Sequence, residues 1–275
     1  MKKTFVASGR LSSKARAFSK VVADVRQAVF AVVRNRPIGD GKYQSTALGS
    51  GFFVSSNAFL TCAHVLNHAT SPHRDGDFYT LSNNLDGEHG MIHEVRKGID
   101  KDIFLYPEHD AAILISGSKP DQAFVPISYS DVPVGQEIGV AGYPLARILA
   151  DENGNATLSG MPYRVAKGVV TAYYKTVLNN GFGQVLKDVH IVEVNFLFVP
   201  GNSGGPIFDA ETGRVIAFVE GFMPFKIAER KETCQLIQPP AGMSPDYLDS
   251  VYAVYSNGLT LEPIRGQLEK FGVSL

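Results

Sequence analysis

Cysteine is scarce in this chain, and neither sign of charge is in excess. Only 2 cysteines, Cys62 and Cys234, occur among 275 residues, which excludes the disulfide framework of small secreted proteins. We expect Cys62 to pack as a small apolar side chain. Lys and Arg number 26 against 27 Asp and Glu, for a formal net charge of −1. This balance gives no indication of binding to nucleic acid or to an anionic membrane surface.

Long apolar runs are also lacking. No run approaches the roughly 20 residues that cross a membrane. The apolar stretch 5–7, after Lys2 and Lys3, is too short for the core of a secretory signal peptide. We therefore expect a cytoplasmic protein that binds neither a membrane nor nucleic acid.

A serine in a glycine-rich turn is the most informative feature. The segment 201–206, Gly-Asn-Ser-Gly-Gly-Pro, follows the apolar run 191–199, which is typical of a strand. Glycine allows a sharp turn and close approach of the backbone to a substrate. The hydroxyl of Ser203 needs a base to become a nucleophile. None of the 7 histidines follows Ser203, which excludes hydrolases with the chain order Ser–Asp–His.

His64 is the best candidate for the base. The segments 49–54 and 58–63 read as two short strands joined by a polar turn, so His64 should lie where the second strand ends and a loop begins. Loops on a rigid scaffold often carry catalytic groups. His64 and His68 share the i, i+4 spacing of some zinc sites, as do His89 and His93, but the glutamate of that motif is absent. We expect no metal and no cofactor.

Asp110 is the best candidate for a carboxylate that orients the imidazole. It heads the wholly apolar run 111–115, which predicts a buried strand. A carboxylate at that position needs a partner, and a histidine N–H is a suitable one. Other aspartates lack this setting, including two that would satisfy an Asp–His–Ser order: Asp100, Asp102, Asp121, Asp24 and Asp40.

Three blocks in this order resemble the signatures of trypsin/chymotrypsin-like serine proteases. They are Thr-Cys-Ala-His at 61–64, His-Asp-Ala-Ala-Ile-Leu at 109–114, and the serine turn at 201–206. The resemblance implies an all-β fold of two six-stranded antiparallel barrels. Residues 28–275 would form this protease domain, and residues 1–27 a helical extension.

The resemblance also implies a catalytic triad of His64, Asp110 and Ser203. The backbone N–H groups of Gly201 and Ser203 would form the oxyanion hole. The expected activity is a serine endopeptidase that hydrolyses polypeptides through an acyl-enzyme. Two alternatives stay open: a catalytically inactive binding module, or a latent enzyme that a regulatory protein partner activates.

Several motifs look more like bacterial Deg-type (HtrA-type) proteases than digestive enzymes. They include the segment 49–54, Val-Ala-Gly-Tyr-Pro at 140–144 and Lys-Gly-Val-Val at 167–170. Asn202 stands where digestive members carry an aspartate that pairs with a newly cut N-terminus, so N-terminal trimming should not activate the chain. No PDZ module is expected after the protease domain.

Specificity residues follow only from the resemblance. Leu197 would form the base of the primary pocket and Ser250 would narrow it, which favours a small or medium apolar residue before the scissile bond. An edge strand made of Glu220, Gly221 and Phe222 would pair with the substrate backbone. Residues 223–249 would form an inserted loop.

Apolar residues at helical spacing predict a helix near each end of the chain. Thr260 would cap the second helix and Gly272 would end it. The first stripe is Phe18, Val21, Val22, Val25 and Val29; the second is Leu261, Ile264, Leu268 and Phe271.

Overall fold

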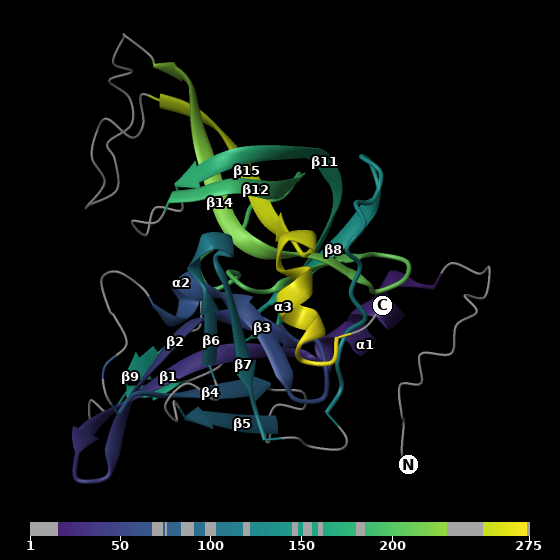
Figure 1. The fold of residues 1–275 in the computed structure, drawn as a ribbon. Coiled ribbons are helices and arrows are strands. Elements are labelled where there is room, and N and C mark those ends of the chain that lie inside the picture. The colour runs from purple at the N-terminus through teal and green to yellow at the C-terminus, as the bar shows by residue number, and fades with distance from the viewer. Residues whose placement is uncertain are drawn as a thin grey trace.

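The fold consists mainly of antiparallel β-structure in two bodies, one formed by each half of the chain (Figure 1). This confirms the all-β class of fold. The computed structural model describes residues 16–67, 74, 76–83, 91–96, 103–117, 122–144, 148–150, 156–158, 162–179, 185–229 and 250–273.

The N-terminal body is a 7-stranded sheet with the order β5-β4-β1-β2-β3-β7-β6. Three phenylalanines, Phe30, Phe53 and Phe59, pack edge-to-face in its core, with ring centroids 5.1–6.4 Å apart. The resemblance implies a six-stranded barrel here, whereas the structure has a sheet of 7 strands. The strands are β1 Val29–Gly39, β2 Lys42–Phe53, β3 Ala58–Cys62, β4 Phe78–Asn83, β5 Met91–Arg96, β6 Ile103–Tyr106 and β7 Ala111–Ile115.

The C-terminal body is a closed barrel with the order β11-β12-β15-β14-β13-β8. Val140, Val192, Ile207 and Val219 are among the buried side chains that fill it. A separate hairpin is formed by β9 (Ile148–Ala150) and β10 (Ala156–Leu158). The barrel strands are β8 Glu137–Gly142, β11 Arg164–Asn179, β12 Val185–Val194, β13 Pro206–Asp209, β14 Val215–Glu229 and β15 Ser250–Thr260.

The predicted inserted loop is partly strand. Residues 223–229 continue β14 and pair with β15, so the two strands form a long hairpin that projects from the barrel (Figure 1). This corrects the prediction of a loop from residue 223. The ladder continues through this segment, with Pro224 opposite Val254. Residues 230–249, with Cys234, lie outside the described residues.

Helices are few and short. In α1 (Phe18–Arg26), Val21 and Val25 are buried, and Phe18 stacks on Phe208 with ring centroids 6.2 Å apart. The C-terminal segment contains a 3-10 turn, η3 (Glu262–Ile264), and α3 (Arg265–Glu269). Thr260 does not cap this helix, because it is the last residue of β15. Among the described residues, no helix is long and apolar enough to span a membrane.

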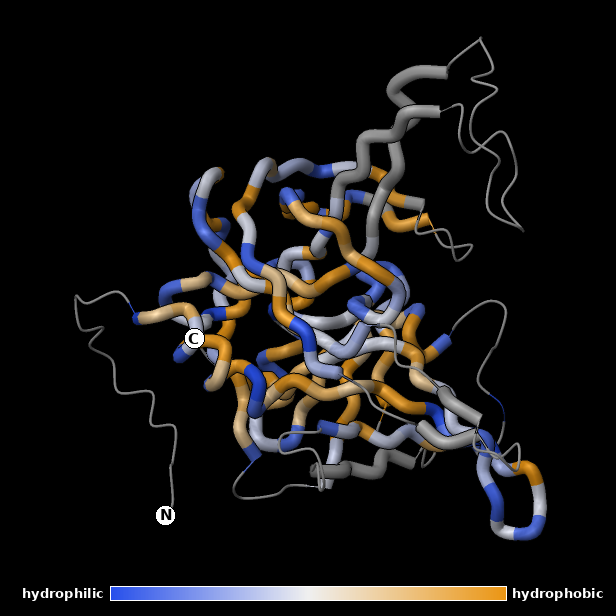
Figure 2. The backbone as a smooth tube through the Cα atoms, turned by 180° about the vertical axis from the view of Figure 1, so that it is seen from behind, coloured by the Kyte–Doolittle hydropathy of each residue, from blue (hydrophilic) through white to orange (hydrophobic). Residues whose placement is uncertain are grey.

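Apolar residues concentrate along the strands inside both bodies, and hydrophilic residues lie mainly at turns (Figure 2). Burial of this apolar surface supplies most of the stabilisation of such a fold. The two bodies meet where β3, which leads directly into α2 (Ala63–Leu66), approaches β14, and where the 3-10 turn η1 (Pro107–His109) approaches β12. That junction contains the side chains singled out by the sequence.

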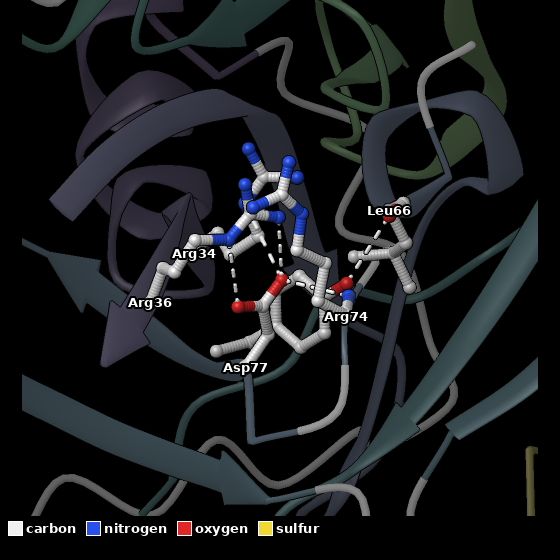
Figure 3. A network of polar contacts seen from close by, with 6 residues as sticks. Arg34, Arg36, Leu66, Arg74 and Asp77 are labelled. Carbon is white, nitrogen blue, oxygen red and sulfur yellow. Dashed lines mark hydrogen bonds and ion pairs between the residues drawn. The ribbon is translucent and has the colours of Figure 1, made fainter. Parts of the chain in front are cut away.

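A polar cluster in the N-terminal body joins β1 to the residues directly before β4 (Figure 3). The buried carboxylate of Asp77 accepts two hydrogen bonds from Arg36, at 2.9 and 3.0 Å, and one from the backbone N–H of Arg74 at 3.0 Å. Burial acts to raise the pKa of Asp77, but these hydrogen bonds lower it. Nearby, the Tyr79 hydroxyl donates to the carbonyl of Leu66 at 3.1 Å, which ties β4 to the end of α2.

Candidate active site

His64 lies in α2, a single helical turn that begins directly after β3. The sequence predicts a loop at this point. The structure instead has a short helix, whose first N–H, from Ala63, donates to the carbonyl of Asp110 at 3.0 Å. His64 is 3% exposed. The helix therefore fixes the histidine against the strand that Asp110 precedes.

Asp110 holds His64 through both carboxylate oxygens. Oδ2 lies 2.6 Å from His64 Nδ1, and Oδ1 accepts the backbone N–H of His64 at 2.9 Å. An ionised carboxylate only accepts hydrogen bonds, so Nδ1 carries the proton and Nε2 is the basic nitrogen. Asp110 is fully buried and has a left-handed backbone, with φ of 46°. It heads β7, as the sequence predicts.

The turn at 201–205 carries Ser203 and is closed by its own backbone. Asn202 N donates to Val199 O, Gly205 N to Asn202 O, and Gly204 N to Val219 O. Among the described residues, the N–H groups of Gly201 and Ser203 are not donors in these backbone hydrogen bonds. The Ser203 hydroxyl donates to the carbonyl of Glu220 at 3.3 Å.

Ser50 joins the serine turn to both bodies. Its hydroxyl donates to the Gly201 carbonyl at 2.7 Å and accepts the Tyr143 N–H at 2.8 Å. Its backbone N–H donates to the Ser203 carbonyl at 2.9 Å. The sequence analysis missed this residue. The signal was the pair of flanking glycines, because a Cβ on Gly49 would lie 2.9 Å from the Ser203 carbonyl oxygen.

The side chain of Glu220 is buried at the same place, with 5% of the residue exposed. Burial, with a further contribution from the negative charge of Asp110, raises the pKa of Glu220 to about 7, while His64 acts in the opposite direction. The sequence predicts a strand here, and Glu220 does lie in β14. Sequence reasoning named Glu220 only as part of the edge strand and gave its carboxyl group no role, because no local motif marks it.

Glu220→Gln should increase stability at alkaline pH. The carboxyl has a higher pKa in the folded chain, about 7, than in the unfolded chain, about 4.3, so the folded state binds more protons between these values and wild-type stability falls as pH rises through that window. The unfolding free energy of the variant minus that of wild type should be up to about 3 kcal/mol larger at about pH 8 than at about pH 4. Urea unfolding at both pH values measures this, and an equal difference at both would contradict it.

The predicted pocket residues are not all brought together. Ser250 lies opposite Glu229, at the far end of the β14–β15 hairpin, so it does not narrow a pocket beside Gly221. The ladder register places Asn257 opposite Gly221 instead. Leu197 follows β12 and is 57% exposed, and its role in the pocket stays a prediction.

Ser256 and Asn257 are polar residues that the sequence analysis missed. Both are fully buried in β15, where they pair with β14. The Ser256 hydroxyl accepts the N–H of Phe198 at 2.9 Å, and this bond fixes the chain between β12 and the serine turn. Ser256 lies opposite Phe222 in the ladder.

Cys62, His64 and Asp110 have potential ligand atoms within 4.8 Å of one another. A metal would have to displace the His64–Asp110 hydrogen bond and bind Cys62 as a thiolate. Burial, followed by the charge of Asp110, raises the pKa of Cys62 well above its usual value. Its Sγ also lies 3.1 Å from the Val219 carbonyl. The group is therefore arranged for hydrogen bonding, with Cys62 packed as predicted.

Comparison with known proteins establishes the family. Residues 49–218 match the model of the trypsin-like peptidase domain. The chain belongs to this family, and the matched segment includes His64, Asp110 and Ser203. The family supports a serine protease class for this chain, in agreement with the resemblance seen in the sequence.

Curated relatives are proteins named probable periplasmic serine endoprotease DegP-like. The one from Pseudomonas putida strain GB-1 is 28% identical over 182 residues, which cover 66% of this chain and 30% of the relative. The one from strain W619 is 27% identical over 175 residues, or 63% of this chain and 29% of the relative. The chain thus spans less than a third of these relatives' length.

Solved structures share the fold. The HtrA-type protease AlgW with decapeptide has a TM-score of 0.58 at 15% identity, over 92% of this chain and 67% of that chain. The same protease with tripeptide has a TM-score of 0.54 at 15% identity, over 92% and 63%. These similarities confirm the chymotrypsin-like all-β architecture.

The prediction of a cytoplasmic location is wrong by this comparison. The curated relatives are named periplasmic, which points to an extracytoplasmic location. The prediction depended on the first residues of the chain and on the small number of cysteines. Residues 1–15 lie outside the described structure, and a shortage of cysteine does not exclude a compartment in which disulfides can form.

Proposed function

We propose that this chain is a serine endopeptidase that uses His64, Asp110 and Ser203 as its catalytic triad. The observation that carries this proposal is the His64–Asp110 pair, in which Oδ2 lies 2.6 Å from Nδ1 and the second carboxylate oxygen holds the backbone of the histidine. This arrangement keeps the imidazole in the tautomer that a general base needs. Residues 28–275 form the protease domain in this proposal, and residues 1–27 the extension.

The reaction begins with transfer of the Ser203 proton to His64 Nε2 as Oγ attacks the peptide carbonyl carbon. In the structure that proton is donated to the Glu220 carbonyl, and a hydroxyl has only one hydrogen to donate. The side chain must therefore turn towards His64 when substrate binds. His64 then protonates the leaving amine, and water hydrolyses the acyl-enzyme with His64 as base.

The oxyanion of the tetrahedral intermediate binds to the N–H groups of Gly201 and Ser203 in this proposal. Two observations support it: these groups are not used in the backbone hydrogen bonds of the turn, and Ser50 holds the Gly201 carbonyl at 2.7 Å. Donors fixed before substrate arrives need no reorganisation during the reaction, which makes them effective.

The proposed substrate is a polypeptide in extended form. On one side of β14, Gly221 and Phe222 pair with β15, whereas the pairing with β13 ends at Phe218. Beyond Val219, the edge of β14 opposite β15 is therefore not paired with β13, and this edge faces Ser203. A peptide could add there as a further strand. The AlgW structures with a decapeptide and with a tripeptide agree with this substrate class.

A latent enzyme is the second candidate. The hydrogen bond from Ser203 to the Glu220 carbonyl favours it, because that bond turns the nucleophile's proton away from the base. A partner or substrate that reorients Ser203 would then activate the enzyme. An inactive binding module would have the same fold without any turnover.

Labelling with a fluorophosphonate probe tests the proposed function. Wild type should be labelled covalently at Ser203, and Ser203→Ala and His64→Ala should lose at least about 10³-fold in labelling rate. Ser130→Ala, a serine exposed on a loop, is the control and should label like wild type. A folded wild type that stays unlabelled, alone and with added peptide, would rule out the active enzyme. Labelling only with peptide would establish latency.

A further inference from the structure

We propose that Ser50 is the positioning residue of the oxyanion hole, and that through it the hole depends on contact between the two bodies. This role rests on the proposed function, because it concerns the direction of the N–H groups of Gly201 and Ser203. Ser50 lies in β2 and is fully buried. It therefore acts through the serine turn, without contact with the substrate.

Every hydrogen-bonding group of Ser50 is used. Its backbone N–H donates to the Ser203 carbonyl at 2.9 Å, and its carbonyl accepts Thr61 Oγ1 at 2.7 Å. Its hydroxyl oxygen accepts the Tyr143 N–H at 2.8 Å, and its hydroxyl hydrogen is donated to the Gly201 carbonyl at 2.7 Å. The backbone N–H of Tyr143 can only donate, and a hydroxyl has a single hydrogen. The direction of the bond to Gly201 is therefore fixed.

Two peptide groups of the serine turn are held by Ser50. One lies between Gly201 and Asn202, and its carbonyl accepts the Ser50 hydroxyl. The other follows Ser203, and its carbonyl accepts the Ser50 N–H. The peptide group between these two carries the N–H of Ser203, and its own carbonyl, of Asn202, accepts Gly205 N at 2.8 Å. The Ser203 N–H thus has a defined direction before substrate binds.

Gly201 is the residue of the turn that most needs an anchor. Its φ of 97° lies in the region that favours glycine, and a glycine loses more conformational freedom than any other residue when it is held in one conformation. Among the described residues, its N–H is not a donor in the backbone hydrogen bonds of the turn. The direction of this N–H therefore follows from where the Gly201 carbonyl is held, and the Ser50 hydroxyl holds it.

The hydroxyl of Ser50 is closely packed as well as buried. A Cβ on Gly142 would lie only 2.8 Å from Ser50 Oγ. Ser50→Ala would remove one oxygen atom, which leaves a smaller space than a water molecule needs. The Gly201 carbonyl and the Tyr143 N–H would then both lose a partner in the interior, and the released carbonyl would let Gly201 rotate.

The same hydroxyl connects the two bodies. Ser50 belongs to the N-terminal body, whereas Gly201 and Tyr143 belong to the C-terminal half of the chain, with Tyr143 directly after β8. The Tyr143 side chain returns to the N-terminal body, where its hydroxyl donates to Asn83 Oδ1 at 2.9 Å. A strand of one body therefore completes the turn of the other, and separation of the bodies would remove the anchor of Gly201.

Ser50→Ala should reduce the rate of fluorophosphonate labelling by about 10²-fold or more, as loss of an oxyanion donor does. Ser45→Ala is the matched control and should be labelled like wild type. It is the same substitution in the same strand, and it also removes a side-chain hydrogen bond of 2.7 Å, to Asn35 Oδ1. The full chain is used throughout. If wild type is labelled only with added peptide, peptide is added to every sample.

The NMR signal of the Gly201 carbonyl reports on the hydrogen bond without any need for activity. Gly-Asn pairs occur only at 154–155 and 201–202. A chain with ¹³C at glycine carbonyls and ¹⁵N at asparagine therefore gives two signals that link a carbonyl to an asparagine N–H, and Asn155→Ser assigns them. Ser50→Ala should shift the Gly201 signal, because the carbonyl loses its hydrogen bond, and Ser45→Ala should leave it unchanged.

A shifted Gly201 signal together with slow labelling supports the proposal. A shifted signal with a labelling rate within about threefold of wild type would overturn it, and so would an unshifted signal. Both of these outcomes leave the proposed function intact, whereas a wild type that is never labelled rejects that function and the role of Ser50 with it. If Ser50→Ala does not fold, Ser50→Cys decides: its thiol is a weaker donor, and labelling at the wild-type rate would overturn the proposal.

Discussion

Asp110→Asn is expected to slow labelling of Ser203 by about 10⁴-fold while the chain stays folded. The carboxylate receives two hydrogen bonds from His64, from the backbone N–H at 2.9 Å and from Nδ1 at 2.6 Å. An asparagine has one acceptor oxygen and one donor group. Either the donor meets the backbone N–H, or it faces Nδ1 and forces the proton onto Nε2. The second case removes the base that Ser203 needs.

The backbone at position 110 tolerates this change. Its φ of 46° lies in the left-handed region, which asparagine adopts nearly as readily as aspartate. The unfolding free energy should fall by only about 1–3 kcal/mol, the cost of one poorly matched buried hydrogen bond. Activity loss that merely follows unfolding would appear as lost secondary structure in circular dichroism.

Asp188→Asn is the matched control for this prediction. Asp188 also has a left-handed backbone, with φ of 54°, but it is exposed in β12 and lies outside the site. Its asparagine variant should be labelled at the wild-type rate. A fall of less than tenfold for Asp110→Asn would show that Asp110 does not set the state of His64.

Gly204→Ala is expected to destabilise the chain by at least about 3 kcal/mol and to abolish labelling. A Cβ at this position would lie 2.3 Å from the Ser50 carbonyl oxygen and 2.3 Å from Thr61 Oγ1. Both atoms belong to the strands that hold the serine turn, and Thr61 Oγ1 itself donates to the Ser50 carbonyl at 2.7 Å. The turn would have to move away from β2 and β3, which displaces Ser203 from His64.

Gly272→Ala separates the clash from backbone strain. Gly272 has φ of 76°, close to the 82° of Gly204, but a Cβ there would meet nothing within 4 Å. This control should cost only the left-handed strain of about 1–2 kcal/mol and should keep full labelling. Urea unfolding measures both variants. Similar losses for Gly204→Ala and Gly272→Ala would mean that the turn can shift freely.

Local sequence alone determined the candidate triad. His64 follows an apolar strand, Asp110 heads one, and Ser203 lies between glycines, so each residue carries a signal within a few neighbours. Their order along the chain excluded other hydrolase arrangements. The structure places His64 and Asp110 in direct contact. The resemblance of these three blocks to trypsin-like proteases implied the all-β class, which is confirmed.

Other features depended on register and could not be predicted from neighbours in the chain. The pairing of β14 with β15 moved Ser250 away from the site and placed Asn257 opposite Gly221. A strand's register depends on the whole ladder, and a shift of a few residues changes which side chains meet. The start of α2 at Ala63 was also missed, because the N–H of Ala63 is satisfied by the distant Asp110 carbonyl.

The sequence by itself therefore determined which residue types could perform acyl transfer and in which order they occur. Only the tertiary structure decided that Ser50 holds the turn through the Gly201 carbonyl, at 2.7 Å, and that Glu220 is buried near His64 and Asp110. Both effects arise from contacts between segments far apart in the chain. Burial also changes the chemistry of a glutamate from that of an exposed residue, and no local pattern records burial of that kind.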